Sequence, residues 1–311
     1  MIDIVMPFYN DSDENLRNIK NQYELKEKPN DRQAMGEERY RDWECLKYWF
    51  RAIEKNCKWV NKVFLILACE SQIPKWLDTS NPKLRIVYHN EYIPKDLLPT
   101  FNAGTIELFI GNIKDLSDNY VYCNDDYYFL NPTNADMFFD ENNTPIYQNG
   151  PEKLVKFGND LLSESDGTFY KMLNNGMDLQ LRIVGCKAKW YNIDHLPVSH
   201  KKNFEKKIID ENYEVFIKAN ISSKFRHKDN FTNHIYVCLY KDLEPYILAN
   251  VYKNSKYVTV RKDTNFKLYE KCDMVCFNDT EQLSQKDFYK VKQNMIYFFE
   301  DIFPQKSSYE K

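Results

Sequence analysis

The chain has 311 residues, a mass of 37.4 kDa and a net charge of −3, with 43 Lys and Arg against 46 Asp and Glu. Its 43% hydrophobic and 29% charged residues are typical of a globular protein and exclude a disordered or collagen-like chain. The charge balance gives no electrostatic basis for nucleic-acid binding, no apolar run reaches the roughly 18 residues of a transmembrane segment, and the N-terminus lacks a signal-peptide pattern. We therefore expect a soluble, cytoplasmic protein of one or two domains.

Three residue types have an unusual abundance or distribution. Glycine is scarce, with 8 residues, so a glycine-rich phosphate-binding loop is not expected. The 23 Tyr and 20 Phe indicate aromatic cores and a surface on which a sugar or base could stack. The eight cysteines are scattered, and only Cys272 and Cys276 are close in sequence, with no second Cys/His pair at the spacing of a zinc site. We therefore expect reduced thiols and no structural zinc.

The first half of the chain alternates between strand and helix patterns. Leu46, Trp49, Phe50 and Ile53 recur at the spacing of one helix face, and a second such pattern follows residue 102. The order strand, helix, strand, strand, helix, strand favours an α/β fold with a mostly parallel sheet and covering helices. The expected strands are 2–8, 62–68, 84–88 and 119–123, and the first helix spans about 38–55.

The second half is less regular and contains no internal repeat. Residues 131–150 carry prolines and a glycine and are expected to form a long surface excursion. The pattern predicts one catalytic domain, 1–311, with an α/β core at 1–130, a helical insertion at about 200–245 and a return to the core at 250–311. Helices are expected near 203–219, 229–241 and 281–302, and strands at 256–260 and 274–277.

An acidic pair, Asp125 and Asp126, directly follows the predicted strand 119–123. The carboxyl ends of strands in open α/β sheets are where ligands bind, and two adjacent carboxylates repel unless a divalent cation lies between them. The alternative is an ordinary turn, because Asn and Asp also favour turns. Asp279 repeats the pattern after the strand at 274–277 and could supply a further metal ligand or belong to a plain turn.

Two further side chains could act on a phosphate or a proton. His195 lies at the end of an apolar-aromatic stretch before a proline, and an imidazole suits proton abstraction from a hydroxyl or contact with a phosphate. Arg226 lies in a basic stretch, and a guanidinium can bind phosphate oxygens in a bidentate manner. For both, an ordinary surface or core residue is the alternative. The same ambiguity applies to Arg39, Arg41 and Asp42 ahead of the first helix, where charges also form caps and surface pairs.

In their order along the chain, these segments resemble the four conserved blocks of the Stealth family of sugar-phosphate transferases. Asn10 takes the Asp or Asn position of the first block, whereas Met6 and Pro7 depart from its usual Tyr-Thr. Ala103 and Gly104 depart from the usual residues of the second block. The similar segments are 2–10, then 39–126 as the closest match, then 195–197 with 225–226, then 276–279, and the tail 302–310.

The resemblance implies an activity. Members of this family transfer a hexose 1-phosphate, often N-acetylglucosamine 1-phosphate, from a UDP-sugar to a sugar hydroxyl, which forms a phosphodiester and releases UMP. Bacterial members build capsular or cell-surface polysaccharides. The family's catalytic core is a Rossmann-like α/β domain related to GT-A glycosyltransferases, so the same fold is expected here.

The resemblance also implies roles for individual residues. Mg²⁺ or Mn²⁺ would be held by Asp126 and Asp279 with Asp125 assisting. His195 would be the general base or a ligand of the donor phosphate, and Arg226 would stabilise the transferred phosphoryl group. The donor pocket would be formed by Asn10, Arg41, Asp42 and Asn102.

Two other functions fit the same residues. A metal-dependent GT-A glycosyltransferase would break the sugar C1–O bond and release UDP, and an inactive sugar-binding scaffold would do neither. The expected partners are a UDP-sugar and a glycan acceptor, which could be lipid-linked. Such an acceptor would place a cytoplasmic enzyme at the inner face of the bacterial membrane, although no amphipathic anchor is evident in the sequence.

Overall fold

A computed structural model describes residues 1–10, 13–27, 36–148, 167–185, 195–215, 223–280 and 283–311. Its central sheet has the strand order β3-β2-β1-β4-β7, in which the first four strands are parallel and β7 is antiparallel to β4. The expected α/β class with a mostly parallel sheet is therefore confirmed. The strands are β1 (Ile2–Pro7), β2 (Val60–Leu67), β3 (Leu84–Tyr88), β4 (Asn119–Tyr122) and β7 (Val198–Lys201).

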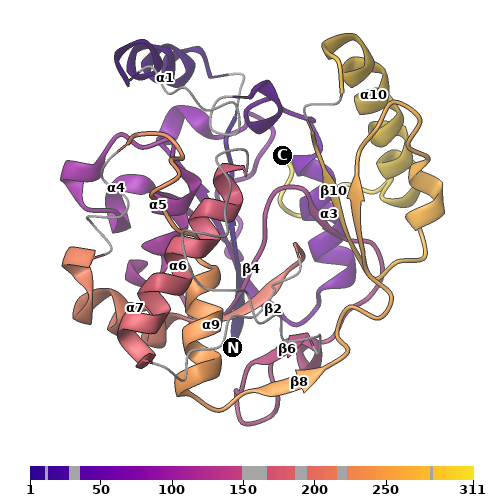
Figure 1. Ribbon diagram of the computed structural model, residues 1–311. Helices are drawn as coiled ribbons and strands as arrows, with labels where there is room; N and C mark the ends of the chain where they lie inside the picture. Colours follow the sequence, from indigo (N-terminus) through magenta and orange to yellow (C-terminus); the bar gives the residue numbers. More distant parts are fainter. Residues whose placement is uncertain (11–12, 28–35, 149–166, 186–194, 216–222, 281–282) are drawn as a thin grey trace.

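Helices cover both faces of this sheet (Figure 1). Successive side chains of a strand point to opposite faces, so Ile4 of β1 packs with one helix layer and Val5 with the other. The first layer contains α3 (Leu46–Asn56) and α10 (Gln285–Ile302). The second contains α4 (His89–Tyr92), α5 (Ala103–Leu108), α7 (Lys202–Glu211) and α9 (His234–Leu243), with α6 (Thr168–Val184) against α9.

Two smaller sheets extend this core. In the first, β10 (Met274–Asn278) pairs antiparallel with β5 (Tyr127–Phe129) and parallel with β9 (Lys256–Thr259). This pairing brings the C-terminal part of the chain beside the acidic pair. In the second, β6 (Ile146–Gln148) pairs with β8 (Ile247–Ala249). The helix α1 (Glu14–Glu27) follows β1 and lies at one end of the molecule (Figure 1).

The first predicted helix begins later than expected, at Leu46. Glu44 adopts a φ of 58°, a left-handed conformation that does not continue an α-helix. The Asp42 carboxylate accepts a hydrogen bond from the Glu44 backbone N–H at 2.7 Å, which stabilises this turn. The turn keeps Asp42 outside the helix, beside the carboxyl end of β1.

Within 200–245 the described helices are α7 and α9, which pack on the central sheet, whereas residues 223–233 form no helix and the helix expected near 229–241 begins at His234. Ile208 of α7 and Ile235 of α9 are buried in the same cluster as Val5. Gly111 allows α7 to approach closely, because a Cβ at this position would lie 3.0 Å from the Lys206 backbone nitrogen.

The prediction that residues 131–150 form a surface excursion is wrong for some of the residues described there. Phe138 and Phe139 are 2% and 3% exposed, and the ring of Phe138 lies 5.2 Å from that of Trp59. The seven described cysteines are free thiols, as expected, and Cys186 lies outside the described residues. None of the helices in the described ranges has the length and apolar character needed to cross a membrane.

Candidate active site

The strand order creates a crevice at the carboxyl ends of β1 and β4. The chain runs from β1 to β2 and β3 on one side and then returns to β4 on the other side of β1. Ligands of open α/β sheets bind where the strand order reverses in this way. Asn10 follows β1, and Asp125 and Asp126 follow β4, so the structure places these predicted site residues around the crevice.

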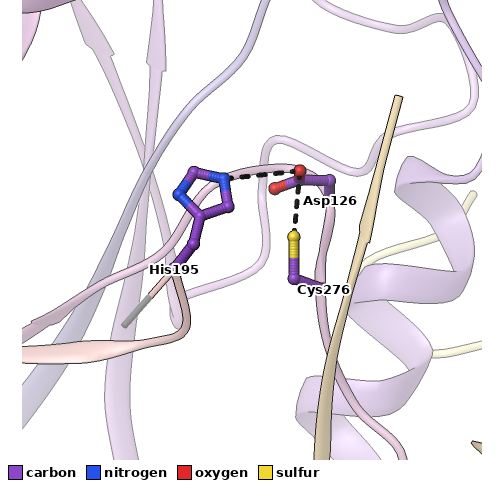
Figure 2. Close-up of side chains that lie close together, drawn as sticks. All are labelled: Asp126, His195 and Cys276. Atoms are coloured by element: carbon purple, nitrogen blue, oxygen red, sulfur yellow. Dashed lines mark hydrogen bonds and ion pairs between the residues drawn. The ribbon is translucent and has the colours of Figure 1, made fainter. Parts of the chain in front are cut away.

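Asp126 and His195 lie together at this edge. The Oδ2 atom of Asp126 is 3.8 Å from Nε2 of His195, and it accepts a hydrogen bond from the Cys276 thiol at 3.2 Å (Figure 2). The His195 ring lies between the rings of Tyr127 and Tyr257, with centroid distances of 5.0 and 5.6 Å. The backbone N–H of Phe277 donates to the Asp126 carbonyl at 3.0 Å, which attaches this turn to β10.

Three carboxylates share a small cavity beside this contact. Asp42, Asp125 and Asp126 all line a space of about 40 Å³. Desolvation by surrounding protein atoms, together with the negative charges of Asp126 and Asp42, raises the pKa of Asp125 to about 7. Because the Asp125 side chain is exposed, water offsets part of this desolvation, whereas the neighbouring carboxylates still repel its charge.

This group of carboxylates fits a divalent cation. The Oδ1 atom of Asp126 is buried and has no hydrogen-bond partner among the described residues. A buried carboxylate oxygen without a donor is costly, and a hard cation such as Mg²⁺ or Mn²⁺ is bound through carboxylate oxygens. Asp125 and Asp126 are therefore well placed to hold such an ion.

A large cleft of about 1450 Å³ opens next to the acidic cavity, and Phe8, Asp42 and Leu46 line both. It lies between α1, the segment before α3, the residues after β2 and the start of α10. Asn10, Arg41 and Asp42, which were predicted to shape the donor pocket, all line it. Its side chains are charged and aromatic, a combination that can bind both the phosphates and the rings of a nucleotide sugar.

Asp279 is placed differently from the expectation that it holds the metal. Its carboxylate accepts from Arg41 Nε at 2.5 Å and from Arg41 Nη2, and the Trp43 indole N–H donates to it at 3.1 Å. The side chains of Arg41 and Asp279 are only 12% and 8% exposed. The guanidinium also lies 4.5 Å from the centre of the Phe288 ring. Asp279 is thus an ion-pair partner of Arg41, and the structure does not bring its carboxylate into the cluster of Asp126 and His195.

Asn10 supports the crevice through the segment that follows β2. Its backbone N–H donates to the Gln72 side-chain oxygen at 2.7 Å, and its side-chain amide donates to the Gln72 carbonyl at 3.3 Å. The Gln72 amide in turn donates to the Asn10 carbonyl at 3.0 Å and to the Asp13 carboxylate at 3.0 Å. Asn10 therefore fixes the start of α1 against the end of β2 at the wall of the cleft.

Asn102 is fully buried and acts at a distance from the cleft. Its Oδ1 caps α5 by accepting from the Gly104 N–H at 3.0 Å, and its Nδ2 donates to Asn230 Oδ1 at 2.8 Å. The same Asn230 oxygen accepts from the His227 backbone N–H at 2.7 Å. Asn102 thus positions the loop that carries Arg226 and does not line the cleft itself.

Glu107 was not predicted as a site residue but lies among the charged groups of the site. The positive charges of Arg226, His195 and Arg39 favour its carboxylate, although desolvation dominates and raises the pKa of Glu107. The Tyr122 hydroxyl lies 2.9 Å from Glu107 Oε1 and 2.6 Å from Asn124 Oδ1, which connects Glu107 to the turn before the acidic pair. The sequence pattern gave no signal for this role, because Glu107 lies inside the second predicted helix and only the structure ends α5 at Leu108.

Comparisons with known proteins find a matching family model and solved structures of low similarity. The family model described as Stealth protein CR2, conserved region 2, matches residues 39–147, which include Arg41, Asn102, Glu107 and the acidic pair. Among solved structures, a galactosyltransferase LgtC in complex with donor and acceptor sugar analogs gives a TM-score of 0.45 at 10% identity, covering 99% of this chain and 97% of that chain.

Similarity to curated relatives extends over the full chain. A capsular polysaccharide phosphotransferase, WcwK, of Streptococcus pneumoniae is 34% identical over 100% of this chain and 98% of its own length. An exopolysaccharide phosphotransferase, cps2G, of Lactiplantibacillus plantarum is 29% identical over 88% of this chain and 87% of its own length. The chain belongs to the Stealth family of polysaccharide phosphotransferases.

Proposed function

We propose that this enzyme transfers a hexose 1-phosphate from a UDP-sugar to a hydroxyl of a glycan acceptor, with release of UMP. The observation that carries the proposal is the contact between Asp126 and His195 at the carboxyl edge of β4, in a chain similar over its whole length to capsular polysaccharide phosphotransferases. The product would be a phosphodiester in a capsular or other cell-surface polysaccharide.

The proposed reaction needs a general base, positive charge beside the transferred phosphoryl group and an in-line arrangement of the attacking and leaving oxygens. The acceptor oxygen attacks the sugar-bearing β-phosphorus, its proton passes to Nε2 of His195, and the bond to the UMP oxygen breaks. His195 suits this role because its ring is oriented by Tyr127 and Tyr257 and because the Asp126 carboxylate stabilises the imidazolium that forms. Arg226, supported by Glu107, stabilises charge on the transferred phosphoryl group.

A divalent cation completes the proposed site. Mg²⁺ or Mn²⁺ bound by Asp125 and Asp126 would neutralise the diphosphate of the donor. The predicted third ligand, Asp279, contributes instead through Arg41, which lines the cleft where we place the donor. Asp42 lines both the cleft and the acidic cavity and so lies between the donor and the cation.

Nucleotide release distinguishes this reaction from its rivals. The full chain is incubated with a panel of UDP-hexoses, Mg²⁺ or Mn²⁺ and oligosaccharide acceptors, and UMP is separated from UDP. We expect UMP, formed at a rate that increases with acceptor concentration. UDP would establish a glycosyltransferase that breaks the sugar C1–O bond, and UDP-sugar binding without either product across the panel would indicate a sugar-binding scaffold.

The role of His195 is tested separately from the reaction type. His195→Ala should lower kcat by roughly 10²–10⁴-fold, as is common when a general base is lost. The acidic limb of the pH–rate profile should disappear in this variant. An unchanged acidic limb would contradict the base role and leave His195 as a ligand of the donor phosphate.

The setting of the reaction is also proposed. The donor would be cytoplasmic, and a lipid-linked acceptor would bring the enzyme to the inner face of the bacterial membrane by peripheral association. Sedimentation of the full chain with vesicles that carry a lipid-linked oligosaccharide tests this. Equal binding to vesicles without the saccharide would contradict recruitment by the acceptor.

A further inference from the structure

The Asp126 carboxylate contacts two different metal-binding side chains through the same oxygen (Figure 2). His195 Nε2 lies 3.8 Å from Asp126 Oδ2, and the Cys276 thiol lies 3.2 Å from the same oxygen. One ligand atom from each of the three residues lies within 4.8 Å of the other two. This cluster overlaps the proposed Mg²⁺ or Mn²⁺ position only at Asp126, and Cys276 has no part in the proposed reaction.

The three donor atoms differ from those that Mg²⁺ prefers. Mg²⁺ is bound by oxygen, whereas a set of imidazole nitrogen, thiolate sulfur and carboxylate oxygen suits Zn²⁺ and similar borderline metals. Three protein ligands and an open fourth position form a common tetrahedral zinc arrangement. In such a site the ligand atoms are about 3.5 Å apart, so modest side-chain rotations would close the cluster around an ion.

Two of the three ligands lie on or directly beside strands of one small sheet. Cys276 lies on β10, which pairs with β5 on one side and β9 on the other, and Asp126 immediately precedes β5. The imidazole of His195 is packed between two tyrosine rings. The other oxygen of Asp126, Oδ1, is the buried atom already assigned to the Mg²⁺ or Mn²⁺ position, so Oδ2 is the atom that faces this cluster.

We infer that Asp126, His195 and Cys276 form a binding site for Zn²⁺ or another thiophilic divalent cation. Binding replaces the hydrogen bond from the Cys276 thiol to Asp126, and the thiol proton leaves to solvent as the sulfur coordinates the metal as thiolate. The ion also takes Nε2 of His195, so zinc inhibits the transfer reaction in which this nitrogen accepts a proton. This inhibition rests on the proposed function, whereas the binding itself does not.

Cobalt substitution tests the binding without any enzyme assay. The full chain is freed of metal with a chelator, kept reduced with a phosphine, and titrated with Co²⁺. We expect one equivalent to produce a near-ultraviolet thiolate-to-cobalt charge-transfer band together with visible bands of tetrahedral Co²⁺, and Zn²⁺ to abolish both. The absence of a charge-transfer band at saturating Co²⁺ would overturn the inference.

Matched variants assign the band to the cluster. Cys276→Ser should lose the charge-transfer band, whereas Cys272→Ser, which changes a buried cysteine four residues earlier on the chain, should keep it. His195→Ala changes a partly exposed side chain, with 39% of it accessible, and so is expected to fold. It should weaken Co²⁺ binding by at least roughly tenfold, since loss of even an outer-shell partner commonly costs roughly 10–100-fold. A band that persists in Cys276→Ser, or Co²⁺ affinity unchanged in His195→Ala, would contradict the assignment.

An activity measurement then separates zinc binding from zinc inhibition. Each variant is assayed with Mg²⁺ at increasing Zn²⁺, relative to its own zinc-free rate, and the zinc is then removed with a chelator. We expect reversible inhibition in the wild type and in Cys272→Ser, and at least tenfold lower sensitivity in Cys276→Ser. Zinc binding with no change in the transfer rate would contradict the proposed inhibition. If the protein shows the cobalt spectrum but releases no UMP, the metal site is supported and the proposed function is wrong.

Discussion

The two strand ends that carry acidic residues look alike in sequence but differ in their surroundings. Asp279 follows β10, and its carboxylate is neutralised by the Arg41 guanidinium and accepts a hydrogen bond from the Trp43 indole N–H. Asp126 follows β4, where Asp42 and Asp125 line the same cavity and one oxygen of Asp126 is buried without a hydrogen-bond donor in the described residues.

The difference shows how the same motif takes two physical roles. A partly buried carboxylate that is paired with a guanidinium maintains structure, and removal of either partner leaves an uncompensated charge. Carboxylates that are placed together without a cation reduce the stability of the fold, and such sites are found where a ligand provides the missing charge. The comparison therefore predicts opposite effects of mutation at the two strand ends.

The largest effect is expected at the uncompensated end. Asp126→Asn should lower kcat by on the order of 10³-fold or more, because it removes a ligand of the cation and the carboxylate beside His195. Its thermal midpoint should stay the same or rise, because one repelling charge is lost. Steady-state kinetics and thermal unfolding measure both, with the exposed Asp136→Asn as a control that changes neither. Near-normal turnover in Asp126→Asn would show that the acidic pair is an ordinary turn.

At the other strand end, where Arg41 balances the charge of Asp279, mutation should lower the stability of the fold. Asp279→Asn leaves Arg41 partly buried without its counter-charge and should lower the free energy of unfolding by roughly 3 kcal/mol. The exposed pair of Lys206 and Asp210, 3.0 Å apart, gives the control: Asp210→Asn should cost less than about 1 kcal/mol. Urea unfolding measures both.

Metal affinity tests the difference between the strand ends of Asp126 and Asp279 directly. Mn²⁺ binding, followed by electron paramagnetic resonance, should weaken strongly in Asp126→Asn and little in Asp279→Asn. Equal weakening in the two variants would break the distinction between the strand ends and return Asp279 to the list of metal ligands.

Glu107 is an intermediate case, because it is an acid near several cations at the edge of the site. Glu107→Gln keeps the shape of the side chain but removes the charge that faces Arg226 and His195, and should lower kcat/KM roughly tenfold with little change in stability. Tyr122→Phe removes only the hydroxyl near Glu107 and should have a smaller effect on kcat/KM. An unchanged kcat/KM in Glu107→Gln would place this residue outside the site.

The smallest effect is expected in the pH dependence of stability. Desolvation and the charges of Asp126 and Asp42 raise the pKa of Asp125 in the folded protein to about 7, whereas an unfolded aspartate titrates near about 4. Between these values the folded state binds more protons than the unfolded state, so this group makes the metal-free protein less stable as pH rises from about 4 to 7. Asp125→Asn should therefore raise the thermal midpoint at pH 8 more than at pH 5. An equal shift at both pH values would contradict the raised pKa.

Much of the fold could be predicted because local periodicity and burial coincide in the strands. The predicted strand at 84–88 matches β3, and those at 2–8 and 119–123 differ from β1 and β4 by one residue. The helix α1 was missed because its only buried side chains in the structure are Leu16 and Lys20, so it has no continuous apolar stripe. The buried part of 131–148 was missed because Phe138 packs on Trp59, a contact that local patterns do not contain.

The sequence by itself determined the strand ends at which acids occur, the position of His195 before a proline and the family to which the chain is similar. Only the tertiary structure decided which acid is paired and which is left for a cation, since Arg41 and Asp279 are 238 residues apart and Asp126 and Cys276 are 150 residues apart. Cys276 reads in sequence as one apolar position of a buried strand, and Glu107 reads as a helix residue. Periodicity reports the face on which a side chain lies, whereas the charge or ligand atom that meets it there depends on how distant strands and loops pack together.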